Sequence, residues 1–346
     1  MKYKRTYLES IAYHLPSTVM TTEALEDRLA PLYQALRLQR GQLEALTGIR
    51  ERRWWNIGHR PSHGALEAAK KALKSSSVPP GDIGALIYGG VCRDNFEPAT
   101  ACAVASGLGL SEAVEVCDIS NACLGVLNGI ISIANRIELG QIRAGMIVSC
   151  ESSREIIDIM IDEMLEAKSM EMFKLSLATL TGGSGAVALI LSDGSYSKAR
   201  PRLLGGVLHS APEHHAICRW GDDLRPQPRA TQFTETDSAA VLKHGVALGV
   251  RTWEAFRREL NWTSDDIHRV ICHQVGGSHR DSILKALSID SEKDFSTFEF
   301  LGNMGTVSLP ITAAIAAERE FIERGDRVAF LGIGSGLNCM MLGWEW

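Results

Sequence analysis

"DISNACLGVLNGI", residues 118–130, joins a strand-like run to a helix-like run and places one cysteine, Cys123, at the junction. Apolar residues after it, among them Leu127, Ile130 and Ala134, recur at helical spacing, so a buried helix is expected to begin close to Cys123. Short apolar runs at 84–90 and 144–150 are typical of strands that are buried on both faces. Strands that alternate with helices predict an α/β fold.

Length, composition and charge limit the class of protein. The chain has 346 residues, 45% of them hydrophobic, and a formal net charge of −5. This composition fits a globular protein with an ample core, and the acidic balance makes nucleic acid an unexpected partner. The least polar stretch, residues 119–135, contains three asparagines and is shorter than the ~20 residues of a spanning helix. No apolar signal region follows the charged N-terminus, so a cytoplasmic location is expected.

The two halves of the sequence resemble each other. The same offset of 184 residues separates Asp82 from Asp266 and Arg143 from Arg327, and an apolar run follows each of these residues. A fixed offset between strand-like runs predicts a duplicated lobe, with an N-terminal lobe at 1–194 and a C-terminal lobe at 195–346. "DISNACLGVLNGI" then faces "FEFLGNMGTVSLP" (298–310), each read as a strand, a turn and an apolar helix. The repeat places Cys123 and Asn303 at equivalent junctions.

Cys123 is one of eight cysteines, and no two of them form a CxxC pair. In a cytoplasmic chain most cysteines are small reduced core residues, and this interpretation stays open for Cys123 as well. A thiol at a helix N-terminus, however, lies near unpaired N–H groups and the positive end of the helix dipole, which favour the thiolate. The position therefore makes Cys123 a candidate nucleophile.

Three further residues stand where a catalytic site would need them. His273 comes directly after the apolar run of "ICHQV", and Asn303 lies in the glycine-flanked turn of "GNMGT". Each also has an ordinary structural interpretation, but both are expected at strand ends, where α/β folds gather their ligands. The glycine-rich "GIGSGLN" (332–338) can approach a ligand closely, so the Ser335 N–H is a candidate donor to an oxyanion.

The motifs "LTGIRERR", "DISNACLGVLNGI", "ICHQVGGSH", "FLGNMGTVSLP" and "GIGSGLN" together resemble the ketoacyl synthase III branch of the thiolase superfamily, in order over nearly the whole chain. This resemblance implies the thiolase fold, with duplicated βα lobes in a five-layer α-β-α-β-α arrangement, and a homodimer. It implies that Cys123 is the acylated nucleophile and that His273 and Asn303 stabilise a thioester enolate. The N–H groups of Cys123 and Ser335 would then form the oxyanion hole.

The type of condensation depends on Glu97 in "VCRDNFEPATAC" (91–102). This run resembles the olefin-pathway enzymes that join two fatty acyl-CoA thioesters without decarboxylation, in which the matching glutamate reaches the partner subunit's site and acts as the base. The resemblance thus implies a non-decarboxylative Claisen condensation to a 2-alkyl-3-ketoacyl product and a β-keto acid. Two alternatives stay open: a solvated glutamate before Pro98, and a decarboxylative 3-oxoacyl synthase that takes a malonyl extender.

Other residues concern the ligands. "RERRWW" (50–55) combines guanidinium groups with indoles, so Arg50, Arg53 and Trp54 are candidate contacts of coenzyme A, although core-packed tryptophans are an equal alternative. The methionines of 156–177 suit an alkyl channel or ordinary core packing. His214 and Cys218 lack a third convergent ligand, so no metal is expected. We expect acyl-CoA as substrate and no cofactor, with enzymes that use the product as further partners.

Two simpler functions remain as alternatives to condensation. One is an acyltransferase or thioesterase that stops after acyl transfer, and the other is a non-catalytic acyl-CoA-binding protein. The joint presence of Cys123, His273 and Asn303 disfavours both.

Overall fold

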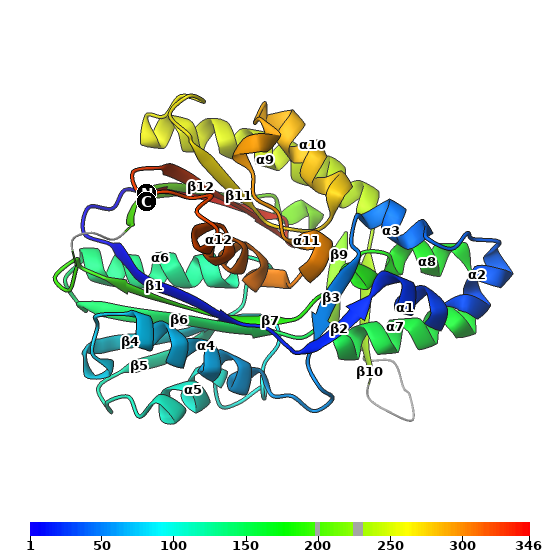
Figure 1. Ribbon diagram of the computed structural model, residues 1–346, viewed down its shortest axis with the longest axis horizontal. Coiled ribbons are helices and arrows are strands. Elements are labelled where there is room, and N and C mark those ends of the chain that lie inside the picture. Colours follow the sequence, from blue (N-terminus) through cyan, green and yellow to red (C-terminus); the bar gives the residue numbers. More distant parts are fainter. Residues whose placement is uncertain (198–200, 224–230) are drawn as a thin grey trace.

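The computed structural model describes residues 1–197, 201–223 and 231–346, and one large sheet runs through it. Its hydrogen-bonded strand order is β11-β12-β13-β8-β1-β7-β6-β4-β5. A single residue pair, Tyr7 with Arg202, joins β1 to β8, so the sheet consists of two halves that fold over each other (Figure 1). The strands of the first half are β1 (Tyr7–His14), β4 (Ile83–Gly89), β5 (Glu115–Ile119), β6 (Ala144–Glu151) and β7 (Gly185–Ser192), and those of the second are β8 (Arg202–Ser210), β11 (Arg269–Cys272), β12 (Arg327–Gly334) and β13 (Asn338–Glu345).

Helices fill three layers around the two half-sheets (Figure 1). Two helices, α6 (Gly125–Glu138) and α12 (Ser308–Glu318), lie between the half-sheets, and one hydrophobic cluster joins them to both. Outside the first half-sheet lie α4 (Pro61–Ser75) and α5 (Thr100–Leu108), and outside the second lie α9 (Ser238–Leu260) and α10 (Gly277–Leu287). The predicted five-layer α-β-α-β-α thiolase fold is therefore confirmed.

The sequence of each layer explains its place. Every residue of β6 and β7 is buried, as expected for strands covered on both faces. Helix α4 turns a row of small alanines toward its sheet, which allows close approach. Helix α12 is buried all around from Ser308 to Ala316 because sheets cover it on both sides. Among the described residues, no helix is both long and apolar enough to cross a membrane.

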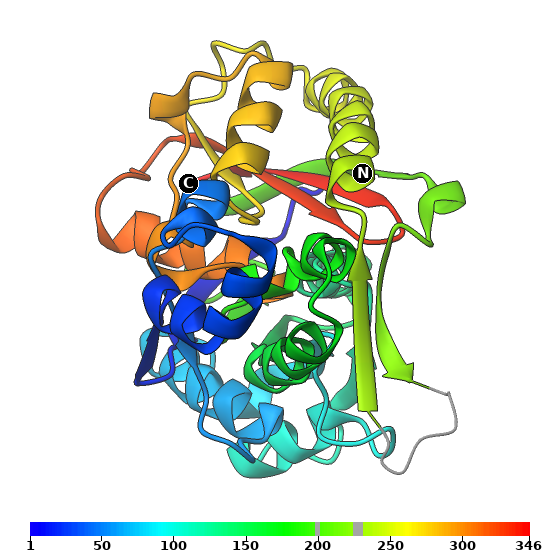
Figure 2. The same ribbon diagram turned by 90° about the vertical axis from the view of Figure 1, so that its right-hand side faces the viewer.

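A separate cap covers the end of the molecule that faces the viewer in Figure 2. Its elements are the helices α1 (Thr22–Arg28), α2 (Ala30–Leu36), α3 (Gln42–Thr47), α7 (Arg154–Ala167) and α8 (Met170–Ser176) and the strand pairs β2 (Thr18–Thr21) with β3 (Glu51–Trp54) and β9 (Cys218–Asp223) with β10 (Thr231–Thr236). The cap has its own hydrophobic core, in which Met160 and Met164 are buried. For these two methionines, core packing is the interpretation that the structure supports.

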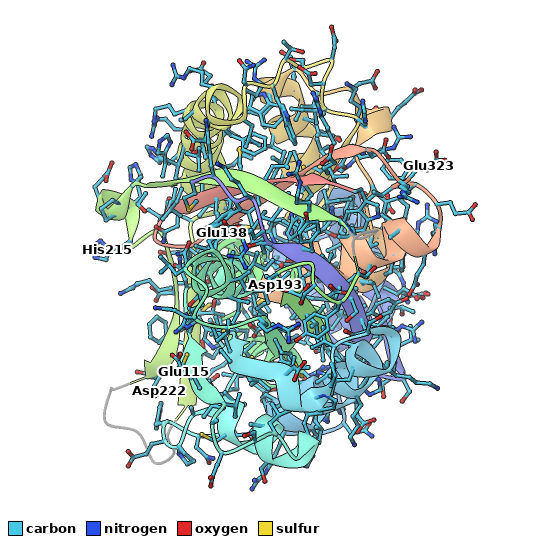
Figure 3. All side chains as sticks on the ribbon, turned by 90° about the vertical axis from the view of Figure 1, so that its left-hand side faces the viewer. Glu115, Glu138, Asp193, His215, Asp222 and Glu323 are labelled. Carbon is cyan, nitrogen blue, oxygen red and sulfur yellow. The ribbon has the colours of Figure 1, made fainter. Side chains whose placement is uncertain are left out.

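At the opposite end of the molecule, seen in Figure 3, the acidic side chains of Glu138 and Asp193 contact the N-terminal segment. Glu138 at the end of α6 accepts hydrogen bonds from the backbone N–H groups of Lys4 (2.8 Å) and Arg5 (2.6 Å). Asp193, just after β7, lies 3.9 Å from the Arg5 guanidinium. These contacts fix the N-terminal segment over the far end of α6, so the helix start at Cys123 points toward the cap.

The internal repeat is present, with one difference from the prediction. The runs after Asp82 and Asp266 form β4 and β11, and those after Arg143 and Arg327 form β6 and β12. Strand β4 pairs with β6, and β11 pairs with β12, and both pairings are parallel. Residues 298–301, however, form a short helix, α11 (Phe298–Leu301), where a strand was expected. The predicted lobe boundary at 194/195 falls in the connection between β7 and β8 and stays a prediction.

The physical reason for the helical turn is a side-chain cap. Gln274 Oε1 accepts hydrogen bonds from the N–H groups of Thr297 (3.0 Å) and Phe298 (3.2 Å). These N–H groups are therefore committed to a turn and not to a neighbouring strand. Asn303 consequently follows a helical turn, not the strand end that we expected.

Candidate active site

Cys123 lies in the tight turn between β5 and α6. Ala122, directly before it, has a left-handed backbone with φ of 44°, an unfavourable conformation for a residue with a side chain. The Leu124 N–H donates to the Asn121 carbonyl at 2.9 Å and closes the turn. The half-buried Cys123 is thus presented on a sharp bend at the start of the central helix.

The thiol of Cys123 is held protonated. Burial raises its pKa to about 12, the thiol of Cys218 and the carboxyl group of Glu151 add to the rise, and only its own backbone N–H acts in the opposite direction. Our expectation that the helix start favours the thiolate is therefore wrong for this structure. The cost of desolvating a charge outweighs the effect of the helix end.

The helix end is also less able to stabilise a thiolate than its position suggested. The Val126 N–H, in the first turn of α6, donates to Thr306 Oγ1 at 2.8 Å. The Leu124 and Gly125 N–H groups donate to carbonyls of the preceding turn. Because these donors are already satisfied, few of them remain for the sulfur.

His273 follows β11 directly, as the sequence predicted. Its backbone N–H donates to the Leu331 carbonyl at 2.8 Å, which fixes the residue beside β12. Burial lowers the pKa of His273 to about 3, and nearby His279 contributes. His273 also borders a small cavity of about 20 Å³, which His279 and Cys339 help to line. At neutral pH the ring is uncharged, so it can donate one N–H without bringing a net charge.

Asn303 is held on both sides by the segment that leads into β7. Its N–H donates to the Thr181 carbonyl and its carbonyl accepts from the Gly183 N–H, both at 2.9 Å. Its side-chain Oδ1 accepts from the Gly305 N–H at 3.1 Å. The side-chain Nδ2 group is therefore the end that remains to donate to a ligand.

The glycine-rich turn after β12 lies against the nucleophile. A Cβ atom on Gly334 would lie 3.2 Å from the Cys123 nitrogen, closer than most real contacts. Asn338 Nδ2 donates to Asn121 Oδ1 (3.1 Å) and to the Ser335 carbonyl (3.3 Å). The turns that carry Cys123 and Ser335 are thus tied together, an arrangement in which their N–H groups can serve one oxyanion.

Glu97 lies in the loop between β4 and α5 and is exposed to solvent. Its neighbour Phe96 is 92% exposed, which is unusual for a large apolar side chain. A general base beside an alkyl channel is expected to be buried, and a single chain leaves the Glu97 carboxyl exposed. The role of Glu97 stays a prediction.

The three predicted coenzyme A contacts differ in their surroundings. Trp54 is only 1% exposed and packs in the cap core, so it cannot stack on an adenine ring, and that part of the prediction is wrong. Arg53 is half-buried. The exposed Arg50 borders a surface hollow of about 530 Å³ together with Glu44 and Phe298. Arg50 and Arg53 are the two candidates that remain.

Two residues near Cys123 were missed by the sequence reading. Glu151 is the last residue of β6 and is buried, and its carboxyl group influences the Cys123 thiol. A carboxylate at the end of an apolar strand was the available signal. Cys218 accepts a hydrogen bond from Ser335 Oγ at 3.1 Å, although the sequence suggested only a weak metal-binding role for it.

Two family models match the chain. Residues 63–177 match the N-terminal domain of thiolase, and residues 258–346 match the C-terminal domain of 3-oxoacyl-[acyl-carrier-protein] synthase III. The first match contains Cys123 and the second contains His273 and Asn303.

Similar proteins were found over the full length of the chain. It is 55% identical to an acyl-CoA:acyl-CoA alkyltransferase of Shewanella oneidensis, with 100% of both chains covered. The cerulenin-bound crystal structure of Xanthomonas campestris OleA is 32% identical, with a TM-score of 0.94 over 100% of this chain and 98% of that one. A cysteine-to-serine form of the same protein with bound lauric acid and lauroyl-CoA has 32% identity and a TM-score of 0.93, covering 99% of this chain and 100% of that one.

Proposed function

The chain belongs to the acyl-CoA:acyl-CoA alkyltransferases of the thiolase superfamily, and from this premise we propose that it joins two fatty acyl-CoA thioesters head to head. The reaction is a non-decarboxylative Claisen condensation, and the enzyme is an acyltransferase. The observation that carries the proposal is full-length similarity combined with a Cys-His-Asn set at the junctions of the two lobes.

The first step is acylation of Cys123. Its sulfur attacks the carbonyl carbon of one acyl-CoA, the bond from that carbon to the coenzyme A sulfur breaks, and coenzyme A leaves as the thiol with the Cys123 proton. One thioester replaces another, so the acyl group stays reactive. We assign stabilisation of the negative oxygen of the intermediate to the N–H groups of Cys123 and Ser335, and the contact between their two turns supports this assignment.

The second step is formation of the carbon-carbon bond. A second acyl-CoA loses its α-proton, and the negative charge moves to its carbonyl oxygen, where the uncharged ring of His273 and the Nδ2 group of Asn303 donate hydrogen bonds. The α-carbon attacks the acyl-Cys123 carbonyl, and the bond to the Cys123 sulfur breaks. The product is a 2-alkyl-3-ketoacyl thioester, which water converts to the β-keto acid and free coenzyme A.

Glu97 is our candidate for the base that removes the α-proton. A substituted glutamate and a substituted cysteine in solved forms of X. campestris OleA stand 26 residues apart, and the same spacing separates Glu97 from Cys123. Glu97 and Phe96 are exposed on one chain, which supports a subunit contact at this loop. We therefore propose a homodimer in which each Glu97 serves the partner's site.

Arg50 and Arg53 are the groups that we propose for the phosphates of coenzyme A. Arg52, which lies between them, is fully buried and donates to Thr22 Oγ1 and the Leu180 carbonyl, so it is committed to the fold. A cytoplasmic location and contact with enzymes that use the β-keto acid complete the proposal.

The experiment that tests the function omits any malonyl donor. Purified protein is incubated with one saturated acyl-CoA, and the products are analysed by mass spectrometry. A β-keto acid with twice the carbon number of the acyl chain supports the proposal. Product that appears only when a malonyl thioester is added would instead support the decarboxylative alternative.

The role of Glu97 is tested by complementation. Glu97→Gln should acylate Cys123 normally and form little β-keto acid. Heterodimers of Glu97→Ala and Cys123→Ala chains should regain up to about half of the wild-type activity, because one of two sites is complete. Heterodimers without any activity would place Glu97 in its own chain's site, and full activity of Glu97→Gln would remove it as the base.

A further inference from the structure

Glu151 is a buried carboxyl group that the steps above do not use. It ends β6 and is 5% exposed. Its Oε1 accepts a hydrogen bond from the Val91 N–H at 2.9 Å, and its Oε2 accepts one from the Cys92 N–H at 3.2 Å. Its carbonyl accepts from Trp55 Nε1 at 3.0 Å. Both carboxylate oxygens are thus committed to backbone donors.

Those two backbone donors begin the loop that carries Glu97. Gly90, directly before them, has no room for a side chain, because a Cβ atom there would lie 3.1 Å from Glu151 Oε1. Cys92 is held to the same place by its thiol, which donates to the Ser152 carbonyl at 3.3 Å. The first residues of the loop are therefore fixed, whereas Glu97, three residues before α5, is exposed.

The other side of Glu151 lies against the turn that carries Asn303. A Cβ atom on Gly305 would lie 3.5 Å from Glu151 Cγ, and Gly305 has a left-handed φ of 59°. The Gly305 N–H is also the donor that orients the Asn303 side chain. A change in the position of Glu151 would therefore reach the Glu97 loop and the Asn303 turn together.

The charge of Glu151 acts on Cys123 as well. The titratable groups that face the carboxylate are Tyr88 on β4, Cys92 in the loop, Cys150 on β6 and Cys123 before α6. The thiol of Cys218 on β9 is the other group that acts on Cys123. None of these groups is a cation. Burial raises the pKa of Glu151 itself, and the hydrogen bonds from Val91 and Cys92 oppose that rise.

We propose that Glu151 is a positioning residue for condensation, which holds the base of the Glu97 loop against the Asn303 turn. This inference rests on the proposed condensation. Two properties of this side chain are separable: its reach to two N–H donors, and its charge.

Two variants separate these properties. Glu151→Gln removes the charge. Its amide NH₂ group would face one of the two N–H donors and cannot accept a hydrogen bond from it. Glu151→Asp keeps the charge but is one methylene shorter, so it loses the reach. Glu155→Gln is the matched control, because Glu155 is an exposed glutamate nearby whose side chain accepts a hydrogen bond from Ser152 Oγ.

Each variant is measured in two assays. One is the rate of Cys123 acylation by a saturated acyl-CoA as a function of pH, followed by intact mass. The other is a single turnover of the acylated enzyme with a second acyl-CoA, followed by β-keto acid formation. Endpoint acylation of one group per chain shows that a variant is folded.

The expected results differ between the variants. Glu151→Gln should acylate Cys123 no more slowly than the wild type at pH 7–8, because losing a carboxyl group that raises the thiol pKa does not decrease the thiolate fraction, and should condense at least about tenfold more slowly. Glu151→Asp should keep the wild-type pH profile of acylation and also condense more slowly. Glu155→Gln should match the wild type in both assays.

The inference fails if either variant condenses at the wild-type rate. A parallel loss of acylation and condensation would also overturn it, because that pattern indicates only general damage to the fold. Failure of the wild-type enzyme itself to form a β-keto acid would instead remove the proposed function.

Discussion

The central helices α6 and α12 occupy the same layer, but the junctions before them differ. Cys123 stands two residues before Gly125, the first residue of α6, and follows a strand. Asn303 stands five residues before Ser308, the first residue of α12, and follows a helical turn. The duplication therefore provides two equivalent helix starts, while the local turns determine which chemical group each one presents.

The two junctions also differ in what they offer a substrate. The first carries a nucleophile whose pKa is raised to about 12 by burial. The second half offers hydrogen-bond donors, among them the ring of His273, whose pKa is lowered to about 3 by burial. Both groups are uncharged at neutral pH, so the nucleophile and this donor meet negative charge on the substrate only as it develops during the reaction.

The largest effect is expected when the sulfur of Cys123 is removed from the first junction. Cys123→Ala should abolish the acyl adduct and lower β-keto acid formation by at least about 10³-fold, because no covalent intermediate can form. Intact mass after incubation with acyl-CoA measures the adduct. Cys218→Ala is the control and should keep the adduct at Cys123. An adduct that survives in Cys123→Ala would show that another residue is the nucleophile.

A change at the second junction should affect only the later step. Asn303→Ala and His273→Ala should each spare acylation of Cys123 and lower condensation by ~10²–10³-fold, which is typical for loss of one oxyanion donor. Single-turnover assays of the acylated enzyme measure this step. Condensation by Asn303→Ala at the wild-type rate would contradict the division of labour between the two junctions.

The buried histidines of the second half should make stability depend on pH. The folded pKa of His273 is about 3 and that of His279 about 4, both below the ordinary value of 6.5 because of burial. As the pH falls below 6.5 the unfolded chain binds protons that the folded chain does not, so stability present above pH 6.5 is lost toward pH 4. Each histidine contributes up to ~1.4 kcal/mol per pH unit in that window.

Replacement of His279 by Asn tests this dependence without touching the predicted donor. Urea unfolding at pH 7.5 and pH 5 should show a smaller loss of stability for His279→Asn than for the wild type. His215, an exposed histidine labelled in Figure 3, provides the control, and His215→Asn should behave as the wild type does. Equal losses in all three proteins would mean that the buried rings do not set the pH dependence.

The smallest expected effect concerns the bond that links the two junctions. The hydroxyl of Thr306, from the second half, accepts from the Val126 N–H of the first half at 2.8 Å. Thr306→Val removes this acceptor at constant shape and should lower the free energy of unfolding by about 1–2 kcal/mol. Thr306→Ser should retain most of it. Thermal unfolding of the three proteins measures the difference. A Thr306→Val variant as stable as the wild type would show that this hydrogen bond does not stabilise the fold.

Much of the fold could be predicted from local pattern. The apolar runs at 84–90 and 144–150 are strands because only buried strands are apolar on both faces, and the offset of 184 residues located their counterparts. The placement of His273 directly after a strand followed from the same pattern. Residues 298–301 could not be predicted, because their conformation depends on Gln274, which is distant in sequence.

The electrostatics of the site could not be read from sequence at all. The pKa of Cys123 depends on desolvation by tertiary packing and on the charge of Glu151, neither of which has a local signature. Trp54 shows the same limit, because the residues next to it in the sequence do not reveal whether its indole is exposed or buried. The identity and position of the candidate residues could thus be predicted from the sequence, whereas their protonation state and solvent accessibility could not.

The shared core of α6 and α12 has a consequence for synthesis of the chain. Their apolar side chains form one cluster, yet about 170 residues separate the two helices in sequence. At ribosomal rates of ~5–20 residues per second, α6 waits roughly 10–30 s before α12 has been translated. During that interval the first half exposes the face that α12 later covers, so the nascent chain is a natural client for chaperones, and slower growth at low temperature should favour soluble protein over aggregate.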